Sequence, residues 1–294
     1  MSLTGFLDRL SDVPTLDRAI EPARTAVRAA LRPTALKDLL HGTWLGHPLH
    51  PVVIQVPTGS WLSAGLLDAI PPLRPAATVL IGTGVAASVP AALTGAADWA
   101  EQGAGVRRLG ALHAALNVVA TGLYVGSLVA RARRRDGLGR GLAYAGLAVA
   151  TGSASIGGHM SYAQSSGASH SAAAARALQH DWMDLGPLDD FPDGRPALRT
   201  GSGGSADVPL VAVRRGARVD VFVGNCSHAS GPLQEGTVEE LRGRTCLVCP
   251  WHGSAFDLDD GTPRRGPAAN HQEKLDVRMD AGRVLARLAG RHQG

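Results

Sequence analysis

The sequence predicts two domains of different fold class: an N-terminal all-α bundle of four transmembrane helices and a C-terminal all-β domain. In the first part of the chain, four long runs contain no Asp, Glu, Lys or Arg: residues 39–67, 75–97, 109–130 and 141–158. From residue 181 the composition changes to short apolar runs separated by Gly, Pro and Asp, which is typical of strands in a small antiparallel domain. A length of 294 residues is enough for both domains.

Each charge-free run is about long enough to cross a hydrocarbon core of ~30 Å as a helix. Pro57 and Pro90 lie inside the runs, and membrane helices tolerate proline when neighbouring groups satisfy the freed carbonyls. The runs are also rich in Gly, Ala, Ser and Thr, which allow helices to pack closely in lipid. A soluble bundle with Ala-rich core helices is the alternative. The tandem arrangement of four runs favours the membrane interpretation.

The predicted organisation has four parts. Residues 1–40 mix Arg, Asp and Pro with apolar residues and are expected to form an amphipathic N-terminal segment of one or two helices. The four-span domain follows at residues 41–162. Residues 163–180 are rich in Ser, Ala and Gly and are expected to be a flexible linker with a short helix within 171–179. The β domain occupies residues 181–290.

Two motifs in the β domain each pair one Cys with one His: Cys226-Ser-His228 and Cys249-Pro-Trp-His252. Together they supply two thiolates and two imidazoles, the ligand set of a [2Fe–2S] cluster in which two Cys hold one iron and two His hold the other. The same four side chains also suit a tetrahedral zinc ion. The ligand types alone leave both metals open.

The residues around the motifs, Cys226-Ser-His-Ala-Ser-Gly-Pro-Leu233 and Cys249-Pro-Trp-His-Gly-Ser-Ala-Phe-Asp257, resemble the Rieske [2Fe–2S] ferredoxin-like family. The resemblance extends from about residue 181 to residue 287 and favours the iron cluster over zinc. It implies an all-β Rieske domain with a [2Fe–2S] cluster as cofactor, and the ligands Cys226, His228, Cys249 and His252.

Trp251 and Ser254 are expected to lie beside the ligands. High-potential members of the family use a Ser and a Tyr to hydrogen-bond the cluster sulfurs, and they join the two loops by a disulfide. Here Ser254 is retained, Phe256 stands in place of the Tyr, and Gly231 and Trp251 stand in place of the two Cys. Fewer donors to the sulfurs stabilise the reduced state less. We expect a reduction potential in the lower part of the Rieske range, which begins at about −150 mV.

Cys246, the third cysteine, is expected to be a buried packing thiol in a strand that leads into the second motif. With two Cys used as ligands, one remains, and no intramolecular disulfide is expected. Runs that alternate or favour β-branched residues predict five strands: Val208–Val213, Arg218–Val223, Thr245–Cys249, Lys274–Met279 and Val284–Leu288.

The helical part carries motifs of its own: Gly46-His-Pro-Leu-His-Pro-Val-Val53, Thr94-Gly-Ala-Ala-Asp-Trp99, His113 and Gly157-Gly-His-Met-Ser-Tyr162. They resemble a family of four-helix bacterial membrane proteins of unknown function (DUF2231-like) over about residues 38–165. The resemblance implies an integral protein of the bacterial cytoplasmic membrane, with lipid around it, and brings no assigned activity.

With four spans, the N-terminus, the loop after the second span and the end of the fourth span share one membrane face. Asp98 and Trp99 are expected there with four histidines. Ionisable residues at membrane depth are candidates for function. The histidines could hold haem b, a quinone or a metal, and the alternative is that they bond to backbone and lipid headgroups. They are His47, His50, His113 and His159.

An Arg-rich loop lies between the third and fourth runs, with five Arg within residues 131–140. The positive-inside rule puts this loop in the cytoplasm and the Rieske domain outside, whereas the basic N-terminal segment argues for the opposite. The loop also contributes to the net charge of +4. It has no interleaved aromatic residues, so no nucleic-acid partner is expected.

The sequence therefore predicts an electron-transfer protein rather than a stand-alone catalyst. Its cluster would relay single electrons between a redox partner protein and a membrane centre or quinone. An oxygenase needs a mononuclear iron site of two His and one carboxylate, usually in a large domain after the Rieske domain, and few residues follow Arg287. Two alternatives stay open: an electron-donor subunit for a separate oxygenase, and a redox-sensing membrane protein.

Overall fold

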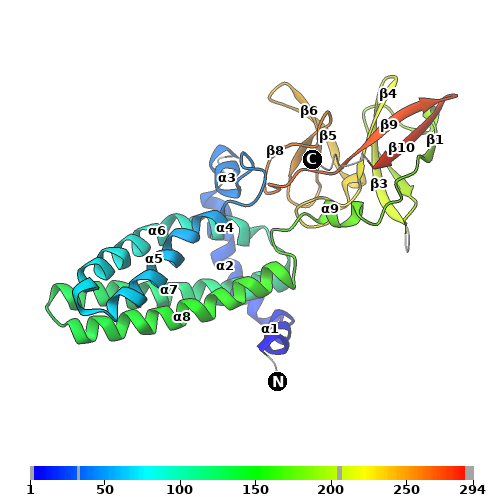
Figure 1. The fold of residues 1–294 in the computed structure, drawn as a ribbon. Coiled ribbons are helices and arrows are strands. Elements are labelled where there is room, and N and C mark those ends of the chain that lie inside the picture. Colours follow the sequence, from blue (N-terminus) through cyan, green and yellow to red (C-terminus); the bar gives the residue numbers. More distant parts are fainter. Residues whose placement is uncertain (1–2, 32–33, 204–206, 289–294) are drawn as a thin grey trace. The chain divides into compact units, whose positions relative to one another are not determined.

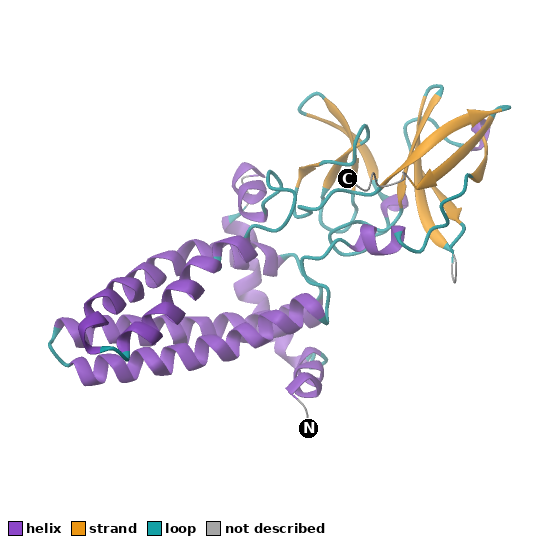
Figure 2. Cartoon of the chain, viewed as in Figure 1, coloured by secondary structure: helices purple, strands orange, loops and turns teal. Residues whose placement is uncertain are grey.

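The structure, a computed structural model, describes residues 3–31, 34–203 and 207–288 (Figure 1). The chain divides into two compact units. The helical unit comprises residues 1–36 and 49–166, and the β unit comprises residues 37–48 and 167–294. Helices and a C-terminal region of strands are thus arranged as the sequence predicts (Figure 2).

Parts of two predicted segments lie outside the described residues. These are residues 1–2 and 32–33 of the amphipathic segment and residues 204–206 and 289–290 of the β domain. In the described part of the amphipathic segment there are three helices rather than one or two: α1 (Leu3–Ser11), α2 (Thr15–Ala30) and α3 (Thr34–His41).

Helices form over the four charge-free runs of the sequence. The first run gives a short helix and a longer one that follow each other through Ile54, whose backbone is also helical. The 3-10 turn Pro71–Leu73 then leads into the second run. Helix α5 packs along α6, and α7 packs along α8. The helices are α4 (His50–Val53), α5 (Gln55–Asp68), α6 (Arg74–Ala100), α7 (Ala104–Ala132) and α8 (Asp136–Tyr162).

Two helical stretches, Pro71–Ala100 and Ala104–Ala132, are long and apolar enough to cross a membrane. Only 22% and 17% of their most apolar windows are buried. Outward-facing apolar side chains such as Val79 and Val118 suit lipid rather than water. Helix α5 has 14 residues and is by itself too short to span. The first and fourth predicted spans stay predictions.

An aromatic stack fills the centre of the helical unit. Trp61 of α5 lies against Tyr124 of α7, with ring centroids 4.3 Å apart and planes 16° apart. Gly84 of α6 makes room for the indole, because a Cβ at that position would lie 2.2 Å from Trp61 Nε1. Close helix packing around large rings therefore depends on a small residue opposite them.

A buried ion pair closes one end of the helical unit. Asp68, the last residue of α5, is 1% exposed and accepts a hydrogen bond from Arg131 Nη1 of α7 at 3.0 Å. Near the other end of α7, Arg108 pairs with Asp17 of α2 at 2.6 Å. The buried charges of Asp68 and Arg131 are thus compensated within the protein, as charges in an apolar environment must be.

The β unit contains two antiparallel sheets. The six-stranded sheet has the order β1-β10-β9-β4-β3-β2, and the four-stranded sheet has the order β5-β6-β7-β8. The five predicted strands are all present, as β3, β4, β6, β9 and β10. The bounds are β1 (Met183–Pro187), β2 (Pro196–Gly201), β3 (Val208–Arg215), β4 (Arg218–Val223), β5 (Thr237–Leu241), β6 (Arg244–Val248), β7 (Ala255–Asp257), β8 (Pro263–Arg265), β9 (Lys274–Asp280) and β10 (Arg283–Leu288).

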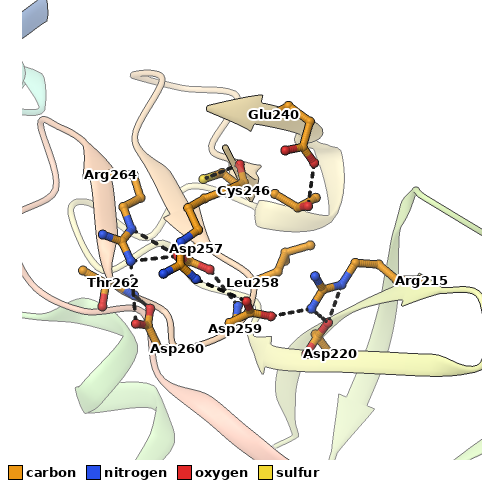
Figure 3. Close-up of polar contacts among 12 residues, drawn as sticks. Arg215, Asp220, Glu240, Cys246, Asp257, Leu258, Asp259, Asp260, Thr262 and Arg264 are labelled. Carbon is orange, nitrogen blue, oxygen red and sulfur yellow. Dashed lines mark hydrogen bonds and ion pairs between the residues drawn. The ribbon is translucent and has the colours of Figure 1, made fainter. Parts of the chain in front are cut away.

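A network of charges joins the two sheets (Figure 3). Arg215 of β3 donates to Asp220 of β4 at 2.8 Å and to Asp259, in the loop after β7, at 2.9 Å. Asp257 of β7 is 1% exposed and accepts from Arg264 of β8 at 2.8 Å. The hydrogen bond from Arg215 to Asp259 ties the loop that follows β7 of the four-stranded sheet to β3 of the six-stranded sheet.

Asp68→Ala is expected to destabilise the helical unit by about 3–5 kcal/mol, because it leaves the Arg131 charge buried without its partner. Detergent-solubilised protein would be unfolded by heat or denaturant and followed by circular dichroism. Asp136→Ala, at an exposed carboxylate that begins α8, is the control. The double variant Asp68→Leu/Arg131→Met should recover much of the loss, since it removes both charges. Equal effects of Asp68→Ala and Asp136→Ala would contradict the prediction.

Candidate metal centre

The first Cys–His motif forms a tight turn directly after β4. The Cys226 N–H donates to the Gly231 carbonyl at 2.9 Å, and the Ser230 N–H donates back to the Cys226 carbonyl at 2.9 Å. Ser230 has a φ of 59°, in the left-handed region that few non-glycine residues adopt. The chain therefore reverses within six residues and holds the Cys226 side chain on its inner side.

The second motif repeats this turn between β6 and β7. The Cys249 N–H donates to the Ser254 carbonyl at 2.8 Å, and the Gly253 N–H donates back to the Cys249 carbonyl at 3.1 Å. Gly253, four residues after the Cys as Ser230 is in the first turn, also has a positive φ, of 74°. The two turns thus share their backbone hydrogen bonds and present their Cys in the same way.

The two thiols lie together in the apolar core between the sheets. Cys226 is 1% exposed and Cys249 is 3% exposed. Each sulfur accepts backbone N–H groups from the residues two and three positions later: His228 and Ala229 for Cys226, and Trp251 and His252 for Cys249. Donors at a buried sulfur favour its thiolate form, which is the form that binds metal.

A hydrogen bond between the thiols separates their proton affinities. It raises the pKa of Cys226, and burial raises that pKa further. The same hydrogen bond lowers the pKa of Cys249 to about 7, helped by the backbone donors and opposed by burial. The pair therefore holds one proton more loosely than the other, and an incoming metal would displace both.

The two imidazoles also lie together. The rings of His228 and His252 have their centroids 5.1 Å apart at 89° to each other, and both side chains are half-buried. Trp251, beside His252, is 56% exposed. Thiol lies next to thiol and imidazole next to imidazole, which is the segregation that a two-iron cluster with one Cys-ligated and one His-ligated iron needs. In the described part of the chain, no three His, Cys, Asp or Glu side chains are grouped to hold one metal ion.

Two glycines allow the turns to approach each other. A Cβ at Gly231 would lie 2.8 Å from Cys249 Sγ and 3.3 Å from the Trp251 ring. A Cβ at Gly236 would lie 2.1 Å from the Val248 carbonyl oxygen. The side chain missing at residue 231 leaves space beside the sulfur of the opposite turn, so the residues present fit a cluster held between the turns.

Gln272 supports the first turn and was not found from the sequence. Its side chain donates to the Val223 and Asn225 carbonyls at 2.7 and 2.9 Å, and its Oε1 accepts the Ser227 N–H at 2.9 Å. The residue is 1% exposed. Because Gln272 lies 45 residues from Ser227, no local motif marks it.

His170 also contacts the first turn, although it lies in the segment that the sequence assigns to a flexible linker. The His170 N–H donates to the Ser227 carbonyl at 3.0 Å, and the His170 ring lies 3.1 Å from Ser230 Oγ. The helix α9 (His170–Ala175) forms there, close to the helix expected within 171–179. Leu178 is part of the core of the six-stranded sheet.

Of the four histidines predicted to lie at the membrane face, His50 and His113 place their rings against backbone carbonyls of neighbouring helices. His50 Nδ1 lies 2.9 Å from the Ala91 carbonyl oxygen, and His113 Nδ1 lies 2.9 Å from the Ser153 carbonyl oxygen. The Asn117 amide lies 3.1 Å from His113 Nε2. These contacts fit the alternative of polar side chains bonded to backbone.

The other two histidines differ in their surroundings. His159 Nε2 lies 3.0 Å from Asp8 of α1, within the helical unit. His47 belongs to the β unit, and its Nδ1 lies 3.1 Å from the Pro48 carbonyl oxygen. Trp99 donates from its indole N–H to the Arg107 carbonyl at 2.8 Å. A common membrane face for all four histidines stays a prediction.

Comparisons with known proteins agree with both resemblances. The family of Rieske [2Fe-2S] domains matches residues 181–277, and the family described as predicted membrane protein (DUF2231) matches residues 46–173. The chain thus joins a membrane-protein domain of that family to a Rieske domain. A Rieske domain implies a [2Fe–2S] cluster, and the paired thiols and imidazoles are where this chain could hold it.

Three similar proteins are ferredoxins or contain one. The anthranilate 1,2-dioxygenase ferredoxin subunit of Burkholderia cepacia is 29% identical over 104 residues, 35% of this chain and 89% of the relative. A structure of the complex of reduced oxygenase and oxidized ferredoxin in carbazole 1,9a-dioxygenase is 25% identical over 39% of this chain and 100% of its own, with a TM-score of 0.33. The ferredoxin of carbazole 1,9a-dioxygenase from Nocardioides aromaticivorans IC177 is 24% identical over 37% and 98%, with a TM-score of 0.32.

Cys246 is buried as predicted and should react slowly with iodoacetamide in the folded protein. Burial, together with the nearby Asp257 carboxylate, raises its pKa to about 11 from 9.0. The thiolate fraction at pH 8 is then about 100-fold lower than for an unperturbed thiol. Mass spectrometry of the Cys246 peptide should show slow labelling that accelerates towards pH 11, and fast labelling after denaturation. Fast labelling of the folded protein at pH 8 would contradict this.

Proposed function

We propose that this chain is a membrane-anchored Rieske protein that relays single electrons between a redox partner protein and a quinone in the membrane. The observation that carries the proposal is the segregated arrangement of two buried, hydrogen-bonded thiols and two half-exposed imidazoles on matching turns. A bound [2Fe–2S] cluster would supply reversible one-electron chemistry. The proposed ligands are Cys226, His228, Cys249 and His252.

The hydrogen-bond donors around the proposed cluster determine the expected reduction potential. Backbone N–H groups of both turns hydrogen-bond the sulfurs and so stabilise negative charge there. Ser254 is buried at the end of the second turn, and Phe256 is buried and has no hydroxyl group. With one side-chain donor fewer than in high-potential Rieske proteins, we expect a potential in the lower part of the range, from about −150 mV upward.

The imidazoles offer the route by which electrons enter and leave. His228 and His252 are half-buried, whereas the two Cys are buried. Ring edges at the surface bring a docking partner closest to the cluster on its His side, and exposed Trp251 adds apolar contact area there. A partner protein would therefore dock over Trp251 and the two rings.

On the membrane side, the proposal rests on the DUF2231 match and on the two long apolar helices. A quinone is the membrane partner that we favour over haem b. A haem would need a free Nε2 on a His ligand, and His113 Nε2 already has the Asn117 amide at 3.1 Å. Absorbance at haem wavelengths in the purified protein would reverse this preference.

A second candidate is an electron donor to a separate oxygenase. It is favoured by the similar ferredoxin subunit of anthranilate 1,2-dioxygenase. The two candidates differ in what oxidises the reduced protein. Rapid reoxidation by a water-soluble quinone analogue under anaerobic conditions supports the membrane relay. Reoxidation only by a protein partner supports the oxygenase donor, and slow reoxidation by both supports a redox sensor.

The cofactor is tested by absorption and low-temperature EPR spectra of detergent-purified protein, as isolated and after dithionite reduction. We expect a reduced Rieske signal and two irons per chain. Zinc without iron would overturn the proposal. Retention in membranes after an alkaline carbonate wash would support the anchor, and release by the wash would contradict it.

Cys226→Ala, Cys249→Ala, His228→Ala and His252→Ala should each abolish the signal, with iron content falling at least about tenfold, since each removes a ligand. Cys246→Ala is the matched control, because this Cys is equally buried and lies three residues before Cys249. It should keep both iron and signal. Loss of the cluster from Cys246→Ala, or its retention in any of the four ligand variants, would contradict the assignment.

A further inference from the structure

The end of α3 and the residues after it belong to the β unit, far from its other parts in sequence. Asp38 is 8% exposed, and its Oδ1 accepts the N–H of Gly266 at 2.9 Å in a buried hydrogen bond. The Arg242 guanidinium lies 3.9 Å from Oδ2. A carboxylate from outside the matched Rieske residues therefore takes part in the Rieske unit.

Gly266 is enclosed by the same segment. A Cβ at this position would lie 3.3 Å from both the His41 ring and the Thr43 methyl group. His41 is 1% exposed. The segment around Asp38 thus packs on the Gly266 backbone as well as hydrogen-bonding it, so the loop after β8 has a fixed position at this residue.

Two residues further on, the same loop reaches the second turn. The Ala268 N–H donates to Ser254 Oγ at 2.9 Å, and this hydrogen bond is buried. Ser254 is 0% exposed, and its carbonyl accepts the Cys249 N–H that closes the turn. Because the hydroxyl oxygen accepts from Ala268, its one hydrogen remains to be donated to a different acceptor.

We propose that Asp38 is a positioning residue for the cluster: through the loop from Gly266 to Ala268 it fixes the hydroxyl of Ser254. The inference rests on the proposed Rieske function. A hydrogen bond to a cluster sulfur stabilises the reduced state, and its strength depends on the direction of the hydroxyl. Asp38 lies in α3, within the segment 37–48 that belongs to the β unit, so a segment remote in sequence from both turns takes part in setting the potential.

The test uses the full chain in detergent, with the midpoint potential measured by EPR-monitored redox titration and iron measured in parallel. Ser254→Ala should change the ratio of oxidised to reduced protein at a fixed potential by roughly tenfold towards oxidised, which is about 59 mV for one electron. Asp38→Ala should shift the ratio in the same direction by less. Asp38→Asn keeps an Oδ1 acceptor and should stay near the unmodified value.

Asp184→Ala is the matched control. Asp184 also accepts a backbone N–H, from Gly186 at 2.9 Å, and pairs with Arg283, but it lies in β1 away from both turns. This variant should leave the potential unchanged. Hydrogen exchange of the peptide that contains Gly266 measures the protection of this loop independently of the potential. Exchange of this peptide should be faster in Asp38→Ala and unchanged in Asp184→Ala.

The double variant Asp38→Ala/Ser254→Ala tests whether Asp38 acts through the Ser254 hydroxyl. If Asp38 acts through the hydroxyl, the double variant should have the potential of Ser254→Ala alone. Additive shifts, an unchanged potential in iron-loaded Asp38→Ala, or loss of iron from Asp38→Ala while Ser254→Ala keeps it would each overturn the proposal. Absence of a Rieske signal from the unmodified protein would instead overturn the proposed function.

Discussion

Four backbone N–H groups are directed at two buried sulfur atoms, and the β unit is arranged to keep them there. A buried thiolate without donors would be costly, so its surroundings must supply hydrogen bonds. The donors come from consecutive residues, which is achieved only if the chain reverses tightly after each Cys. The reversal needs a positive φ, which Gly253 adopts freely and Ser230 adopts at a cost.

The strain at Ser230 is offset by contacts from distant parts of the chain. Its N–H closes the turn on the Cys226 carbonyl, and its hydroxyl lies against His170. Gln272 accepts the N–H of Ser227 in the same turn and donates to the carbonyls of Val223 and Asn225, which precede it. The first turn is therefore held by His170, which precedes β1, and by Gln272, which precedes β9. The shape of the turn thus depends on distant parts of the β unit.

Much of this architecture could be predicted from the sequence. Strands such as β3 and β4 are rich in buried β-branched and other apolar residues, and this composition is visible locally. β7 has only three residues and β5 is largely exposed, so neither has a run long enough to be found. The Cys–His spacing indicated the chemistry, but the positive φ of Ser230 could not be read from a serine.

Contacts across long sequence separations explain what sequence reasoning missed. Asp38 and Gly266 are 228 residues apart, and Asp38 by itself looks like an ordinary acid in a short amphipathic helix. Asp38 matters because it is buried. A carboxylate that is removed from water needs hydrogen-bond donors from the protein, and the Gly266 N–H is one of them. Once that amide is fixed, the short path to Ala268 leaves little freedom for Ser254 Oγ. In this proposal, the direction of the Ser254 hydroxyl is thus set by Asp38, a residue that no local motif around the four proposed ligands includes.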